Sequence, residues 1–217
     1  MTHSTHSYLA LCVACAALAG CTPELIHEPL ANAQHRATPL SFGLKVSPDP
    51  AENPIDPPER FAGYHAALDL EVSQGEVDGD VPVYAICTGR VIYSGYAEGY
   101  GGLLVHRCKI NKQDVTVLYG HLDPGNLPGE SETVRAGQTI GVLAPPKSYE
   151  SGMNRKHLHL GIHKGKNLDL RGYVQTEEEL DAYIDPATLL PNFFLDLPGA
   201  SPGEVPYWEI EEESEEE

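Results

Sequence analysis

Histidines alternate with apolar residues in the stretch His157-Leu158-His159-Leu160-Gly161-Ile162. Successive side chains of a β-strand point to opposite faces, so the pattern predicts both imidazoles on one face and the leucines and isoleucine on the other. His163 continues the histidine face, but it stands near the strand end, and we interpret it as structural or exposed. The stretch therefore predicts a strand with one apolar face and one face that carries two nitrogen ligands.

Several other segments have the length and the Val, Ile, Leu and Tyr content of strands. They are Ala67 to Val72, Pro82 to Ser94, Gly102 to Ile110, Val115 to His121 and Thr139 to Leu143. Glycines separate them, as short antiparallel connections require. A short helix is expected over Thr176 to Tyr183, where Thr176 can cap the first turn and three glutamates follow. The predicted fold is mostly β, an antiparallel, sandwich-like domain with short connecting helices.

Composition and length divide the chain into one domain with tails. Prolines crowd Thr22 to Pro58, and we expect a proline-rich tether over residues 21–38 before a domain over residues 39–192. Seven of the last nine residues are glutamates, so residues 193–217 are expected to form a disordered acidic tail. The formal net charge of -18 argues against nucleic acid as a partner.

The N-terminus has an apolar run, Tyr8 to Gly20, that is too short to span a bilayer as a helix. It fits the core of a secretion signal over residues 1–20, although no Lys or Arg precedes it. The run ends in Leu18-Ala19-Gly20-Cys21, which resembles the lipobox of bacterial lipoproteins. That resemblance implies cleavage before Cys21 and acylation of its thiol, which would anchor the chain to a membrane. An ordinary signal peptide with a chance cysteine is the alternative.

After removal of such a signal, Cys87 and Cys108 are the remaining pair of cysteines besides Cys21. They lie in apolar segments on either side of a glycine-rich turn, Gly99 to Gly102, and could face each other across a hairpin. An oxidising compartment would favour a disulfide between them.

A metal site is indicated by His65 and Asp69, which are separated by three residues. Catalytic zinc takes three protein ligands of this kind and keeps one position open for water. One histidine from the strand at residues 157–159 would complete the set. We expect no function for the other histidines of the signal and the tether, nor for His106, which lies in a strand without a partner that the sequence reveals.

The order of these motifs resembles the lysostaphin-like or LytM-like zinc endopeptidases. Their signature is His-x-x-x-Asp, then Tyr-Gly-His-Leu, then His-Leu-His, and all three are present in order. The resemblance extends from about Pro39 to Pro191 and also includes Phe42-Gly43, Pro82-Val83-Tyr84-Ala85, Gly89-Arg90-Val91, Tyr100-Gly101-Gly102 and Val134-Arg135-Ala136-Gly137-Gln138-Thr139-Ile140-Gly141.

The resemblance implies the duplicated-hybrid-motif fold of those enzymes and one zinc ion per chain, bound by His65, Asp69 and His159. It also implies that His121 and His157 stand beside the metal as catalytic groups without binding it. The activity it implies is hydrolysis of the peptide cross-links of peptidoglycan. The lipobox-like sequence in turn implies a lipid-anchored protein that faces the periplasm, with a mild preference for the outer membrane because Thr22, and not aspartate, follows Cys21. Tyr119 would share the face of His121, although we interpret it as a core tyrosine.

Two departures from the family pattern concern the cleft and not the ligands. The loop Ala144 to Lys156 is longer than the usual Gly and Ser-rich link and contains Tyr149, Arg155 and Lys156, and the segment Lys164 to Asp185 is similarly particular. Both leave the cleaved bond open.

Three alternatives remain at this stage. A catalytically silent member of the fold would bind cell-wall hydrolases such as amidases. A lipoyl-type carrier would need a lysine at a hairpin tip, which we do not find. A secreted zinc enzyme would act on soluble proteins in place of peptidoglycan.

Overall fold

The computed structural model describes residues 26–190. Within them a six-stranded antiparallel sheet forms the centre of the domain, in the order β3-β10-β7-β6-β5-β8. Its strands are β3 (Ala67–Glu71), β5 (Gly89–Ala97), β6 (Gly101–Ile110), β7 (Gln113–Leu122), β8 (Thr133–Val134) and β10 (His157–Lys164). The expected signal peptide with Cys21 and the expected acidic tail lie outside the described residues.

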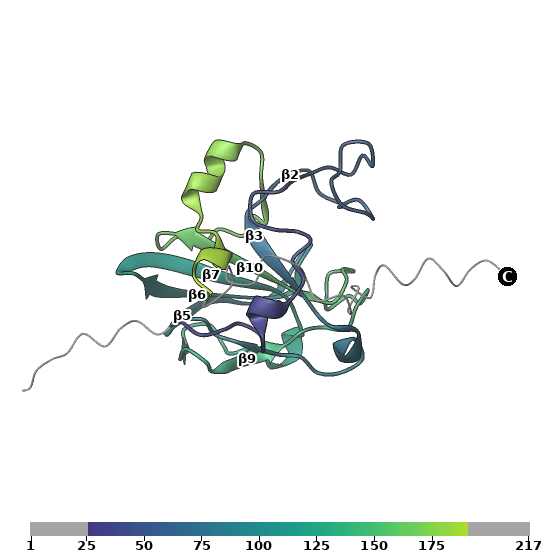
Figure 1. Ribbon diagram of the computed structural model, residues 1–217. Helices are drawn as coiled ribbons and strands as arrows, with labels where there is room; N and C mark the ends of the chain where they lie inside the picture. The colour runs from purple at the N-terminus through teal and green to yellow at the C-terminus, as the bar shows by residue number, and fades with distance from the viewer. Residues whose placement is uncertain (1–25, 191–217) are drawn as a thin grey trace, which may run out of the picture.

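Two smaller sheets flank the central one. Figure 1 shows β9 below the central strands and β2 above them. The lower sheet pairs β4 (Pro82–Tyr84) with β9 (Thr139–Val142), and the upper sheet has the order β1-β2-β11, with β1 (Lys45–Val46), β2 (Gly63–His65) and β11 (Tyr173–Val174). Within residues 26–190, no helix is both long enough and apolar enough to cross a bilayer.

All described helices are short 3-10 turns: η1 (Ala33–His35), η2 (Gln74–Glu76), η3 (Pro124–Asn126), η4 (Glu177–Ala182) and η5 (Pro186–Thr188). The helix expected over Thr176 to Tyr183 is η4. The side chain of Glu179 accepts hydrogen bonds from the backbone N–H groups of Gln175 and Thr176, which satisfies donors at the start of the turn. The expected mostly antiparallel β fold with short helices is confirmed.

The main core lies between the central sheet and the β4–β9 pair. Leu68, Leu70, Leu158 and Leu160 from the sheet are fully buried there, and Val83 packs from β4. Burial of each such side chain stabilises the fold by about 1.5 to 3 kcal/mol. This packing buries the apolar face of β10 that the alternation in its sequence predicts.

One expected strand is wrong in the structure. The segment Pro82 to Ser94 is two strands, β4 and β5, which belong to different sheets. Gly89 begins β5 where a β-carbon would lie 1.8 Å from the carbonyl oxygen of Arg107, so the chain enters the central sheet at a point that only glycine fits. Apolar content alone cannot show a change of sheet, because both halves are buried against the same core.

Part of the segment that we expected to be a tether packs on the domain. Leu30 and Ala33 are fully buried in the main core. The carbonyl oxygens of Ala37 and Leu40 accept hydrogen bonds from the N–H groups of Glu71 and Asp69 and so cover the free edge of β3. Proline density argues against regular elements but not against burial, which is why composition missed this packing.

A disulfide bond joins the segment before β5 to β6, and β6 also carries a buried histidine. Cys87 and Cys108 are joined, with Cα atoms 6.2 Å apart. His106 has a partner that the sequence did not reveal: its Nε2 lies 3.1 Å from the hydroxyl of Tyr119, which in turn accepts a hydrogen bond from the N–H of Ile86. His106 is completely buried, and this burial lowers its pKa to about 4.

Acidification is therefore expected to destabilise the fold through His106. Its pKa is about 4 in the folded chain, against about 6.5 for an ordinary histidine, so the unfolded chain binds more protons between these two pH values. The free energy of unfolding is therefore highest above pH 6.5, and it decreases by up to about 3 kcal/mol as the pH falls toward 4. Urea unfolding of the metal-free protein at several pH values measures this loss. A His106→Gln variant should have a shallower pH dependence, and an unchanged one would contradict the assignment.

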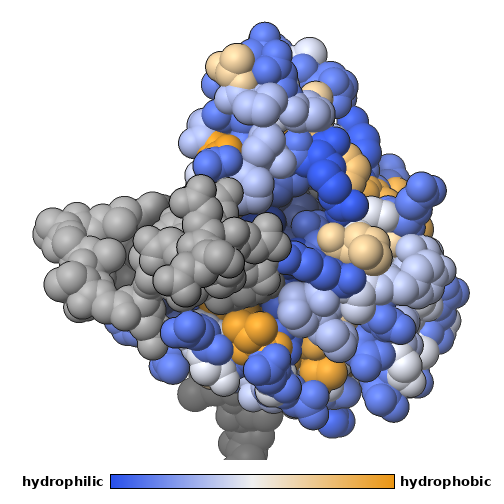
Figure 2. All heavy atoms as spheres, turned by 90° about the vertical axis from the view of Figure 1, so that its right-hand side faces the viewer, coloured by the Kyte–Doolittle hydropathy of each residue, from blue (hydrophilic) through white to orange (hydrophobic). Residues whose placement is uncertain are grey.

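On the face drawn in Figure 2, hydrophilic residues predominate, and a recess separates the upper part of the molecule from the body below it.

Candidate metal centre

Strand β10 presents its histidines on the face opposite the core. His157 and His159 line a pocket of about 330 Å³, whereas Leu158, Leu160 and Ile162 are fully buried in the core. The strand period of two produces this division. His163 lies farther along the strand, and its Nε2 is 3.7 Å from Asp169.

His65 and Asp69 reach the same face from the neighbouring chain segment. His65 ends β2, and β3 then pairs with β10 in a register that sets Asp69 directly opposite His159. Opposed residues of an antiparallel pair have β-carbons about 4.5 to 5.5 Å apart, which brings their side-chain tips into contact. The register between two strands that are distant in sequence thus assembles the site.

Three potential ligand atoms converge here. His159 Nδ1 lies 3.0 Å from Asp69 Oδ1 and 3.2 Å from His65 Nε2, and His65 Nε2 lies 3.4 Å from Asp69 Oδ1. A tetrahedral ion with bonds of about 2.0 to 2.2 Å places its ligand atoms about 3.3 to 3.6 Å apart. The three residues therefore fit a zinc ion with little adjustment, and two imidazoles with one carboxylate are a donor set that zinc favours.

The protonation of these groups also suits a metal. Burial raises the pKa of Asp69, but electrostatic interactions and hydrogen bonds with the neighbouring His157, His65 and His159 outweigh it and hold the pKa well below its usual value. Burial lowers the pKa of His159 to about 4. Metal ligands must be deprotonated, so an ionised carboxylate and a neutral imidazole are ready at neutral pH.

His121 comes to the pocket through an irregular end of β7. The pairing of β6 with β7 shifts at Gly102 and Leu103, and His121 has a φ of 64°. In a regular strand His121 would share the face of Tyr119, as we expected from the sequence. That expectation is wrong: Tyr119 lies in the main core, whereas His121 lines the pocket. The bulge turns the histidine to the opposite face.

The rings of His121 and His157 lie side by side, with centroids 4.4 Å apart. His121 Nδ1 donates to the carbonyl oxygen of Ser151 at 2.9 Å, and its Nε2 faces the amide of Asn154 at 3.4 Å. Burial lowers the pKa of His121 well below its usual value, so the ring is neutral. His157 Nδ1 donates to the carbonyl oxygen of Arg155 at 3.0 Å, which directs Nε2 toward Asp69 Oδ2, also at 3.0 Å.

Comparison with known proteins shows to which family the chain belongs. Residues 63–170 match the family model described as Peptidase family M23. Lipoprotein NlpD of Yersinia enterocolitica is 32% identical over 108 residues, which cover 49% of this chain and 97% of the relative. The chain belongs to peptidase family M23. The family resemblance that the three motifs indicated is confirmed.

Two solved structures that are similar to this M23 chain both have TM-scores below 0.5. The crystal structure of cbpa from L. salivarius REN is 20% identical, with 79% of this chain and 97% of that chain covered and a TM-score of 0.49. The solution structure of lysostaphin is 19% identical, with 78% of this chain covered and a TM-score of 0.45. The M23 chain spans 60% of that lysostaphin chain.

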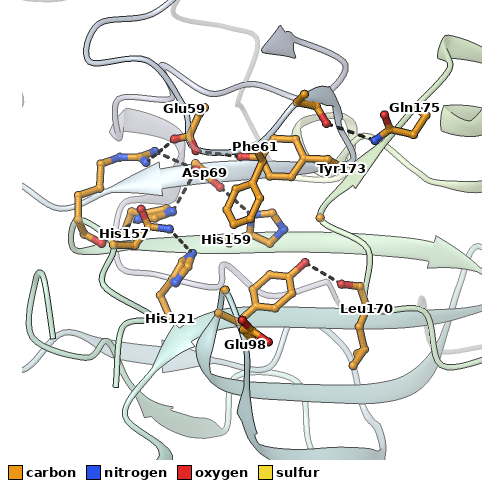
Figure 3. A pocket seen from close by; sticks show the side chains of 16 residues that line it. Glu59, Phe61, Asp69, Glu98, His121, His157, His159, Leu170, Tyr173 and Gln175 are labelled. Atoms are coloured by element: carbon orange, nitrogen blue, oxygen red, sulfur yellow. Dashed lines mark hydrogen bonds and ion pairs between the residues drawn. The ribbon is translucent and has the colours of Figure 1, made fainter. Parts of the chain in front are cut away.

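Several pocket residues of the M23 domain were not found from the sequence. Figure 3 shows Asp69, His157 and His159 converging on the pocket, with His121 below and Glu59 and Tyr173 above. The hydroxyl of Tyr173 lies 3.3 Å from Glu59 Oε2, and Phe61 stacks on Tyr173 with centroids 5.3 Å apart. These residues come from the two segments flanking the motifs, where the sequence has no regular period that could place them.

The loop before β10 supplies two further residues. Arg155 lies among carboxylates at the edge of the pocket. Lys156 is buried, and its Nζ donates to the carbonyl oxygens of Glu76, Val77 and Gly79. The sequence indicated that this loop borders the cleft, but not what its cations contact. Together they tie the start of β10 to η2 and β3.

Proposed function

We propose that this M23 domain is a zinc metalloendopeptidase that hydrolyses the peptide cross-links of bacterial peptidoglycan. The observation that carries the proposal is the convergence of His65 Nε2, Asp69 Oδ1 and His159 Nδ1 within 3.0 to 3.4 Å of one another, beside an open pocket that Asp69 and His159 line. We assign the metal to these three residues. The family membership supports a peptidase acting on the cell wall.

A zinc ion held by these residues would supply an activated water at neutral pH and polarise the scissile carbonyl. The chain's own residues must then move protons and stabilise the developing oxyanion. His121 and His157 are suited to this work because they lie beside the ligands with fixed ring orientations. We assign them as the catalytic pair, and the division of roles between them is left open.

The walls of the pocket favour a peptide over a phosphate polymer. Glu59 and Glu98 line it together with the aromatic rings of Phe61, Tyr100 and Tyr173. The formal charge of -18 adds to this exclusion of polyanions. A flexible stem peptide carries backbone amides that such a polar and aromatic pocket can hold.

Digestion of purified sacculi by the domain from residue 22 onward tests this function. We expect zinc-dependent loss of cross-linked dimers, read as released muropeptides by mass, and no loss in excess chelator. Casein serves as the control substrate. Efficient cleavage of casein with intact sacculi would instead indicate a zinc protease for soluble proteins, and no cleavage of either would refute the endopeptidase.

The alternative is a catalytically silent or partner-activated member of the family that regulates cell-wall hydrolases. The complete set of candidate ligands and the two adjacent histidines argue against it. If the zinc-loaded domain leaves sacculi intact but stimulates an added amidase, the alternative holds.

We further propose that Cys21 carries lipid and anchors the domain at the cell envelope, facing the periplasm and with a mild preference for the outer membrane. The lipobox-like sequence before Cys21 and the similarity to a protein named as a lipoprotein support this. The intact mass of the membrane-extracted protein should begin at Cys21 and include acyl chains. A water-soluble mature chain without added mass would contradict it.

A further inference from the structure

Two groups of potential metal ligands overlap at Asp69. The first contains His65, Asp69 and His159, and the second contains Asp69, Glu71 and His157. In each group the ligand atoms lie within 4.8 Å of one another, and all members are buried. Judged by ligand type and distance alone, this buried cluster could hold two cations that share Asp69 as a ligand.

The second group already holds a cation of the chain itself. The guanidinium of Arg155 places Nη2 2.8 Å from Asp69 Oδ2 and 2.7 Å from Glu71 Oε1, and Nε 2.8 Å from Glu71 Oε1. Its Nη1 lies 3.3 Å from Glu59 Oε1. One side chain thus contacts three buried carboxylates, including the shared one.

The charges explain why a cation must be there. The side chains of Asp69 and Glu71 are each only 2% exposed, and buried carboxylates without a counter-charge are costly. Glu71 Oε2 is buried without a hydrogen-bond partner among the described residues. Within the described part of the chain, the second group therefore still lacks a hydrogen-bond donor at Glu71 Oε2.

We infer that the guanidinium of Arg155 occupies a place where a second metal ion could otherwise bind, and that it keeps the zinc centre mononuclear. By holding Asp69 Oδ2 together with His157 Nε2, it also leaves Oδ1 as the oxygen that faces His65 and His159. The carboxylate then serves the first site with one oxygen. This inference rests on the proposed zinc centre and extends it.

The guanidinium of Arg155 also connects Asp69, a proposed zinc ligand, to the pocket wall. Arg155 contacts Glu59, whose other oxygen accepts from the hydroxyl of Tyr173. A second ion in place of the guanidinium would keep the neutralisation of Asp69 and Glu71. It would not reproduce the contact of Nη1 with Glu59, because that contact depends on the planar guanidinium, which binds several carboxylates at fixed angles.

Metal content after removal of Arg155 tests the inference. Wild type, Arg155→Ala and Arg155→Lys are stripped with chelator, loaded with excess zinc, desalted and analysed by elemental mass spectrometry. We expect one ion per chain in wild type and in Arg155→Lys, which keeps a cation, but two in Arg155→Ala. With cobalt in place of zinc, two bridged ions should show spin coupling in the electron paramagnetic resonance spectrum.

The double variant Arg155→Ala with Glu71→Gln is the matched control, because it lacks a charged ligand of the second group. Its content should return to one ion per chain. A single ion in Arg155→Ala would overturn the inference. If Arg155→Ala does not fold without metal, excess zinc should restore folding, and failure to do so in both Arg155→Ala and Arg155→Ser would also overturn it.

The outcomes separate this inference from the proposed function. One zinc in wild type and two in Arg155→Ala, without hydrolysis of sacculi, would leave the inference standing and refute the endopeptidase. If wild type hydrolyses sacculi and Arg155→Ala has the same metal content as wild type, the endopeptidase function stands and the inference about Arg155 is refuted.

Discussion

Replacing His159 with alanine is expected to abolish both zinc binding and hydrolysis of cross-linked peptides. His159 Nδ1 is the atom closest to both other ligand atoms, at 3.0 Å from Asp69 Oδ1 and 3.2 Å from His65 Nε2. Without it two protein ligands remain, which is fewer than catalytic zinc sites use. Loss of the metal's contribution should lower kcat/KM by three or more orders of magnitude, about 4 kcal/mol.

Zinc titration against a chromophoric chelator and muropeptide release measure the two effects. His163→Ala is the matched control, since His163 lies on the same strand but contacts Asp169 and Tyr183 in place of the ligands. It should keep its zinc and most of its activity. Full zinc content in His159→Ala would show that the metal is held elsewhere.

Replacing His121 or His157 with alanine is expected to lower kcat by about 10² to 10⁴-fold while the zinc remains bound. The reason is that neither ring belongs to the first ligand group, His65, Asp69 and His159, yet both stand beside it. Steady-state kinetics on a defined cross-linked muropeptide, together with metal analysis of each variant, measures the separation.

The two variants should differ in zinc affinity. His157 contacts Asp69 Oδ2 at 3.0 Å, so its removal is expected to weaken zinc binding by about 10 to 100-fold, as loss of outer contacts to a ligand does. His121 binds Ser151 and Asn154, and its removal should leave the affinity near that of wild type. The kinetics therefore require saturating zinc. More than half of the wild-type kcat in either variant would remove that histidine from the mechanism.

Much of the fold and of the site could be predicted from local patterns. The alternation in β10 places His159 and Leu158 on opposite faces because side-chain direction in a strand depends only on its period. The order of the motifs that contain His65, Asp69 and His159 predicts the family of the chain, and the M23 match confirms it.

Other features depend on contacts between distant segments. Whether Pro82 to Ser94 is one strand or two depends on which sheet each half joins, and the face of His121 depends on a bulge opposite β6. Leu30 is buried by packing that its proline-rich surroundings do not predict. None of these has a local sequence signal.

The sequence by itself determined the strand period, the order of the ligand types and the family, because these follow from residue identity and short-range geometry. Only the tertiary structure decided that Arg155 lies among Glu59, Asp69 and Glu71, and that the ring of His121 faces the pocket and not the core. The reason is physical: the cost of burying a charge, and the direction of a side chain at a bulge, depend on neighbours that come from other strands.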